Sequence, residues 1–169
     1  MEKFLEKLSS YNILNNLLPG TIFCYLMDML FNINLLKNSI IIDLFLFYFM
    51  GMIVSRIGSV MIEPALKKVK FVEFAEYDEY LTASKKDPKI DVLSETNNTY
   101  RTILGLCATL LICKTYIFLC DIIPCLNNCS LVIIIISISI LFAFAYRKQT
   151  SYIKDRVKKA NEDNMEGAV

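Results

Sequence analysis

The chain contains no histidine and no tryptophan, and its 169 residues include only 5 glycines and 4 prolines. Without imidazole there is no Ser-His-Asp or Cys-His nucleophile system and no His-containing metal site. Phosphate loops, dinucleotide-binding turns and nucleophile elbows are missing as well. We therefore expect no enzymatic activity, no catalytic residue, no cofactor and no bound metal.

Charge is sparse over long stretches, although 55% of the residues are hydrophobic and the net charge is only +1. So small a charge gives no basic field for nucleic acid, and direct nucleic-acid binding is not expected. Residues 17–36, 40–57, 102–123 and 129–146 are apolar over roughly the 20 residues that a helix needs to cross a bilayer. The sequence predicts an all-α integral membrane protein with four transmembrane helices in a single domain, residues 1–169.

The distribution of cationic residues predicts the orientation in the membrane. Most of the 18 Lys and Arg residues precede the first span, lie between the second and third spans or follow the fourth. By the positive-inside rule, both termini, the segment 58–101 and the tail 147–169 face the cytoplasm. We expect a multi-pass protein of the cytoplasmic (inner) membrane. Asp87-Pro88 is typical of a helix start, so 58–101 is predicted to form a protruding helical hairpin.

Two ionisable residues, Asp28 and Lys114, lie at matching depth inside predicted spans. Such residues are costly in lipid and mark candidate functional sites. An Asp28–Lys114 ion pair would either fix the order of the helices or belong to an ion or proton pathway. Alternatively, Lys114 extends outward to Asp121 or Asp43.

Small residues recur along one side of the second span, at Gly51, Ser55, Gly58 and Ser59. Small side chains let helix backbones approach closely in membranes. The stripe therefore predicts helix packing, either within the chain or between copies in a homo-oligomer.

The 6 cysteines show no metal-ligand spacing. Cys125 and Cys129 flank a short loop on the predicted outer side, where an oxidising space would permit a disulfide. The alternative is that these thiols are small apolar packing residues, as we expect for the other cysteines.

Aromatic residues recur at near-helical spacing in the predicted cytoplasmic hairpin, at Phe71, Phe74, Tyr77 and Tyr80. Acidic residues lie among them, and residues 71–84 include no Lys or Arg. Because the inner leaflet is anionic, this amphipathic helix is expected to pack against protein, either its own hairpin or another chain.

Three stretches carry a family resemblance: YNILNNLLPGTIF at 11–23, SRIGSVMIEPALKK at 55–68 and NNTYRT at 97–102. They resemble small four-span membrane proteins of bacterial anti-phage defence loci. The membrane subunit of the Kiwa system is the nearest likeness, and the small membrane accessory of type VI-B CRISPR systems is a rival. The resemblance implies an oligomeric membrane sensor or effector with a cytoplasmic partner encoded nearby.

Three functional hypotheses follow. The first is a non-enzymatic, homo-oligomeric membrane subunit of antiviral defence that acts through a cytoplasmic protein partner. The second is a small ion channel or transporter that uses the intramembrane charges. The third is an assembly or scaffold subunit of a larger membrane complex.

Overall fold

The computed structural model describes the backbone of residues 2–37 and 39–166 and the side chains of 15–37 and 39–161. Every regular element in this part of the chain is a helix, which confirms the all-α fold class. In chain order they are α1 (Glu2–Phe31), α2 (Ile40–Ile57), the π-helix η1 (Gly58–Ile62), α3 (Glu63–Lys68), α4 (Tyr77–Lys86), α5 (Lys89–Ile122), α6 (Pro124–Asn128) and α7 (Ser130–Glu166). The predicted tail therefore continues the last long helix, and its residues 167–169 lie outside the described part.

Three helical segments among the described residues are long and apolar enough to cross a membrane. They are Ile40–Lys68, Lys89–Ile122 and Ser130–Asn161. The first predicted span, 17–36, is not helical throughout, because α1 ends at Phe31. Asn32 has a φ of 54°, in the left-handed region that asparagine tolerates better than most residues and that cannot continue a right-handed helix.

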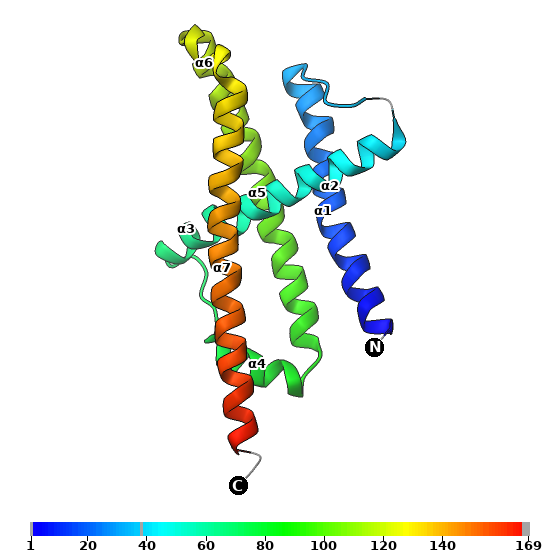
Figure 1. Cartoon of the computed structure of the whole chain (residues 1–169), viewed down its shortest axis with the longest axis vertical. Helices are drawn as coiled ribbons and strands as arrows, with labels where there is room; N and C mark the ends of the chain where they lie inside the picture. Colours follow the sequence, from blue (N-terminus) through cyan, green and yellow to red (C-terminus); the bar gives the residue numbers. More distant parts are fainter. Residues whose placement is uncertain (1, 38, 167–169) are drawn as a thin grey trace.

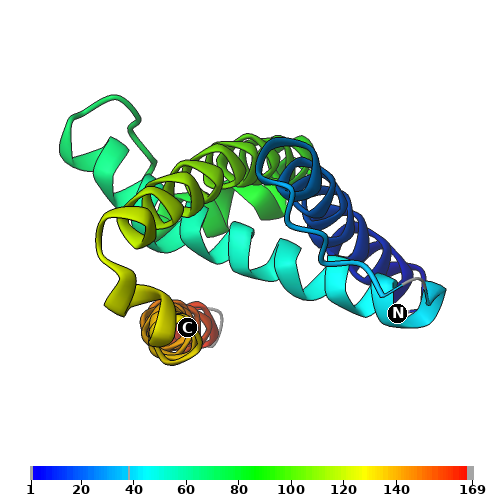
Figure 2. The same ribbon diagram turned by 90° about the horizontal axis from the view of Figure 1, so that it is seen from above.

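The long helices do not form the parallel bundle that four aligned spans would give. Helices α1, α5 and α7 run along the length of the molecule, and α2 runs across them (Figure 1). Viewed from above, α7 is seen end-on while α2 is seen along its length (Figure 2). The start of α1, helix α4 and the end of α7 lie toward one end of the molecule. The turn before α2 and helix α6 lie toward the other end.

Glycines allow α2 to cross its neighbours with backbones in contact. A Cβ atom on Gly51 would overlap the carbonyl of Asn16 in α1, and one on Gly20 would overlap the carbonyl of Phe47 in α2. On the other side of α2, a Cβ atom on Gly105 of α5 would lie 2.5 Å from the carbonyl oxygen of Val54. The buried core sits at these crossings and contains Phe23, Cys24, Met27, Val54 and Leu106.

The segment between α2 and α5 is not the predicted two-helix hairpin, since α2 and η1 cross α5 instead of pairing with it, and α3 lies beyond the crossing (Figure 1). Residues 71–76 are not helical, so Phe71 and Phe74 lie outside α4 and the predicted amphipathic helix is wrong in its first half. The reason is a Schellman turn that ends α3. The N–H of Lys70 donates to the carbonyl of Lys67 (3.0 Å) and that of Phe71 to Leu66 (3.0 Å).

The predicted helix start at Asp87-Pro88 is confirmed, and from there α5 runs without a break to Ile122. Asp87 is extended, and its carboxylate accepts a 3.0 Å hydrogen bond from the N–H of Lys89. Pro88 already has helical dihedral angles and lacks only an N–H that would be unpaired in the first turn.

We predict that Lys70→Gly stabilises the protein by about 0.5–1 kcal/mol. Lys70 has a φ of 56°, a conformation that costs a residue with a side chain roughly 1–2 kcal/mol. Glycine avoids this strain, and its gain is reduced only in part by the greater freedom that it has in the unfolded chain. The measurement is thermal unfolding followed by circular dichroism. Lys68→Gly, within α3, is the matched control and should destabilise by a similar amount. Equal shifts for both variants would contradict the prediction.

Candidate functional site

A π-helical turn at Gly58–Ile62 joins α2 to α3 and leaves one backbone carbonyl without a partner inside the helix. The N–H of Glu63 donates to the carbonyl of Gly58, five residues back, as a π-helix requires. The carbonyl of Ser59 would pair in the same way with residue 64, but Pro64 has no N–H. That carbonyl instead accepts a 2.9 Å hydrogen bond from the ammonium of Lys148 in α7.

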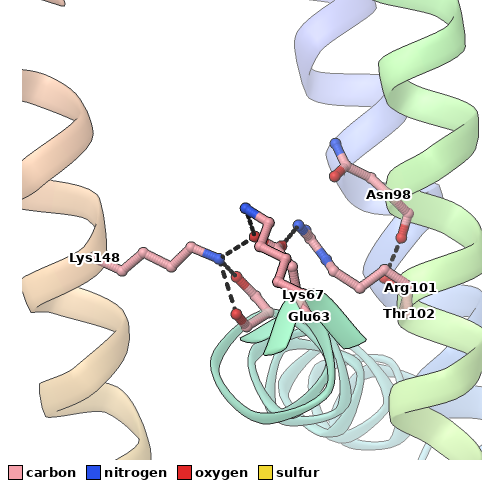
Figure 3. Close-up of polar contacts among 7 residues, drawn as sticks. Glu63, Lys67, Asn98, Arg101, Thr102 and Lys148 are labelled. Atoms are coloured by element: carbon pink, nitrogen blue, oxygen red, sulfur yellow. Dashed lines mark hydrogen bonds and ion pairs between the residues drawn. The ribbon is translucent and has the colours of Figure 1, made fainter. Parts of the chain in front are cut away.

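Glu63, the first residue of α3, is buried with only 5% of its surface exposed. One carboxylate oxygen accepts from the guanidinium of Arg101 at 2.6 Å. The other lies 2.9 Å from the ammonium of Lys148 and 3.3 Å from that of Lys67 (Figure 3). This single carboxylate therefore connects α3 to both α5 and α7.

The cluster holds more positive charge than Glu63 can balance, because three cations surround one carboxylate. The Nε atom of Arg101 is also buried, with no hydrogen-bond partner in the described part of the chain. A buried charge is costly unless it is paired, so the partly buried Arg101 and Lys148 depend on Glu63 more than the exposed Lys67 does. The arrangement is suited to attracting an anion at its rim.

Helix α7 joins the rest of the chain mainly around this cluster. Lys148 also donates to the hydroxyl of Ser59 at 3.0 Å. One turn further along, the ring of Tyr152 lies 5.6 Å from that of Tyr77 in α4. By contrast, only 6% of the most apolar 18-residue window of α7 is buried inside the molecule.

The four residues predicted to face a partner occupy two different settings. Tyr77 stacks with Tyr80 at a centroid distance of 6.5 Å, and the Tyr80 hydroxyl donates to Asp91 of α5 at 3.2 Å. Phe74 lies under the ammonium of Lys67, 4.1 Å from the ring centroid. Phe71 is 76% exposed. The two tyrosines therefore pack within the chain, and Phe71 is the more open of the two exposed phenylalanines, since Phe74 is 47% exposed.

Asp28 and Lys114, which the sequence places inside predicted spans, are both exposed, and no ion pair joins them within the described residues. The ammonium of Lys114 lies 5.7 Å from the ring centroid of Phe31, one turn beyond Asp28. Their pairing stays a prediction.

The small-residue stripe packs inside the chain. Gly51, Ser55, Gly58 and Ser59 are all buried. A Cβ atom on Gly58 would lie 2.6 Å from the carbonyl oxygen of Arg101, so this end of the stripe lies against α5.

The six cysteines are free thiols. Cys125 and Cys129, on the short connection that includes α6, are both exposed. Their disulfide stays a prediction.

Sequence reasoning missed Glu63, Arg101 and Lys148 as members of one site. One signal was available: Glu63 is the single charged residue between Arg56 and Lys67, in an otherwise apolar stretch. Its partners could not be deduced from spacing, because they lie 38 and 85 residues away along the chain.

Compared with protein-family models, curated proteins and solved structures, the chain shows no match. Over the residues that the structure describes, the fold and the hydropathy of the helices define the class: an all-helical protein with three helices that could cross a membrane.

Proposed function

We propose that the chain is a non-enzymatic, multi-pass protein of the bacterial cytoplasmic membrane that works as a homo-oligomeric subunit. The observation that carries this proposal is the exposure of α7. Its apolar half contains no charged residue, and side chains such as Leu131 (70% exposed) and Ile135 (55% exposed) have little of the molecule against them. Apolar surface of this extent needs lipid or a second copy to cover it.

The proposed topology has four membrane passes: α1 is added to the three helical segments that are long and apolar enough to cross a membrane. The start of α1, helix α4 and the end of α7 lie toward one end of the molecule (Figure 1). These three segments carry eight Lys and Arg residues, whereas the turn before α2 and helix α6 carry only Lys37, so the positive-inside rule places the first end in the cytoplasm. Helices α1, α2, α5 and α7 then cross in alternating directions, with α2 strongly inclined.

The proposed partner is a cytoplasmic protein encoded nearby, and the proposed process is defence against phage. Phe71 is exposed in the non-helical segment before α4, where Glu73 and Glu76 add negative charge. An exposed aromatic side chain with acidic neighbours suits a protein surface better than an anionic membrane. The link to antiviral defence rests on the sequence resemblance described above.

The test co-expresses the chain with the adjacent gene product and purifies both in detergent. We expect an oligomer larger than one chain that retains the partner. Phe71→Asp should lose the partner. Val92→Asp, which changes another exposed apolar residue (59%) at the start of α5, should keep it. Cells carrying both genes should also reduce phage plating. Extraction by carbonate without detergent, a bare monomer, or unaltered plating would contradict the proposal.

A second candidate function, an ion channel or transporter, is favoured by one observation. Asp28 and Lys114 are exposed on the apolar stretches of α1 and α5, and charged groups inside a membrane need water or each other. Liposome flux that falls with Asp28→Asn and Lys114→Met would support a channel, and flux unchanged by both would remove it.

A further inference from the structure

An open cavity of about 360 Å³ lies between the π-helical turn and α7. Apolar groups line one part of it, including Val60 and Phe144. Polar and cationic groups line the rest, including Arg147, Lys148 and Ser151. Phe144, Arg147, Lys148 and Ser151 recur every three or four residues, so they share one face of α7.

Two polar groups of this cavity are unused by the protein. Lys148 donates to Ser59 and Glu63 and is fully engaged. The guanidinium of Arg147 and the hydroxyl of Ser151, by contrast, make no hydrogen bond or ion pair within the described residues. Because they are one turn apart on α7, both can donate to one ligand.

The electrostatics select an anion. Glu63 is already shared among Lys67, Arg101 and Lys148, so the wall behind the cavity carries excess positive charge. Guanidinium groups bind the oxygens of phosphates bidentately and more strongly than neutral donors do. A phosphate ester matches this combination of a free guanidinium, a free hydroxyl and a positive background.

The position of the cavity along α7 indicates that the phosphate belongs to a lipid. Residues 130–146 contain no charge, and the basic tail begins at Arg147. In the membrane topology proposed above, the cavity therefore lies at the level of the cytoplasmic headgroups, with Phe144 and Val60 on the acyl-chain side. Basic pockets between transmembrane helices at this level suit anionic headgroups.

We propose that this cavity binds the phosphate of an anionic phospholipid, with Arg147 and Ser151 as donors and Phe144 against the first part of an acyl chain. The inference rests on the proposed membrane placement. Bound there, the lipid touches both the π-helical turn and α7, and so stabilises their contact.

The test measures the binding of phosphatidylglycerol and phosphatidylcholine to the detergent-purified chain by native mass spectrometry. We expect the wild type to prefer phosphatidylglycerol and Arg147→Gln to bind it roughly ten-fold more weakly, as for loss of a charged hydrogen bond. Arg156→Gln is the matched control, because residue 156 lies on the opposite face of α7 and carries the same charge. Equal losses for the two variants would overturn the proposal, since general surface charge would then explain binding.

Two further arms complete the test. Ser151→Phe fills the cavity without changing charge and should weaken phosphatidylglycerol binding, whereas an unchanged affinity would overturn the site. Inorganic phosphate should not compete at millimolar concentration, and effective competition would identify a free phosphate instead of a lipid. If the chain proved extractable without detergent, the membrane placement itself would fail, which is a different result from a membrane-embedded chain that shows no lipid preference.

Discussion

Glu63→Gln is expected to lower the free energy of unfolding by about 3 kcal/mol, within the roughly 3–5 kcal/mol lost when one partner of a buried ion pair is removed. The substitution keeps the shape of the side chain but removes its charge. Arg101, Lys148 and Lys67 would then face one another with no counter-charge, 2.6–3.3 Å from a neutral amide. The contact of α7 with the π-helical turn should weaken most, because Lys148 is its principal link.

Thermal unfolding in detergent, followed by circular dichroism, measures this effect, since the chain has no tryptophan for fluorescence. A loss of 3 kcal/mol corresponds to a midpoint lower by roughly 10 °C for a chain of this size. Glu79→Gln is the matched control: Glu79 is exposed in α4, and its loss should change stability by less than about 0.5 kcal/mol.

A double variant separates charge from packing. In Glu63→Gln combined with Lys148→Met, one of the unbalanced cations is removed, so part of the lost stability should return. If Glu63→Gln cost no more than the control, or if the double variant were the sum of its parts, the buried ion cluster would not have the role we assign to it.

Gly51→Ala is expected to destabilise the protein by about 2 kcal/mol or more, in the range of over-packed cores. The added methyl would overlap the carbonyl of Asn16, which is helix backbone and cannot rotate away. Elsewhere in a helix the same change stabilises by about 1 kcal/mol, because alanine has the higher helix propensity. The sign of the effect therefore tests whether α1 and α2 cross in backbone contact.

The measurement is again the unfolding midpoint in detergent. Ala160→Leu serves as the control, because it enlarges an exposed residue in the tail of α7 and should be nearly neutral. A Gly51→Ala protein more stable than the wild type would show that the crossing is looser than the structure has it.

The sequence by itself determined most of the long helical segments and, at Asp87-Pro88, where one of them begins. Apolar runs of membrane length predicted α2, the C-terminal part of α5 and the N-terminal half of α7, because hydropathy is a local property. Asp87-Pro88 marked the start of α5, because capping depends on neighbouring residues alone. Local patterns were less reliable at helix ends: neither Asn32 nor Lys70 is glycine, and yet both adopt left-handed conformations that terminate a helix.

Only the tertiary structure decided how the helices cross and which charges meet. Hydropathy predicts that a segment is apolar, but it does not predict the direction of the helix. Helix α2 crosses its neighbours because Gly20, Gly51 and Gly105, from three separate helices, lie at the points where the backbones touch. In the sequence, Glu63 is simply one acidic residue before a proline. It becomes the centre of a buried cluster because folding brings to it cations that lie 38 and 85 residues away, a distance over which sequence spacing carries no geometric information.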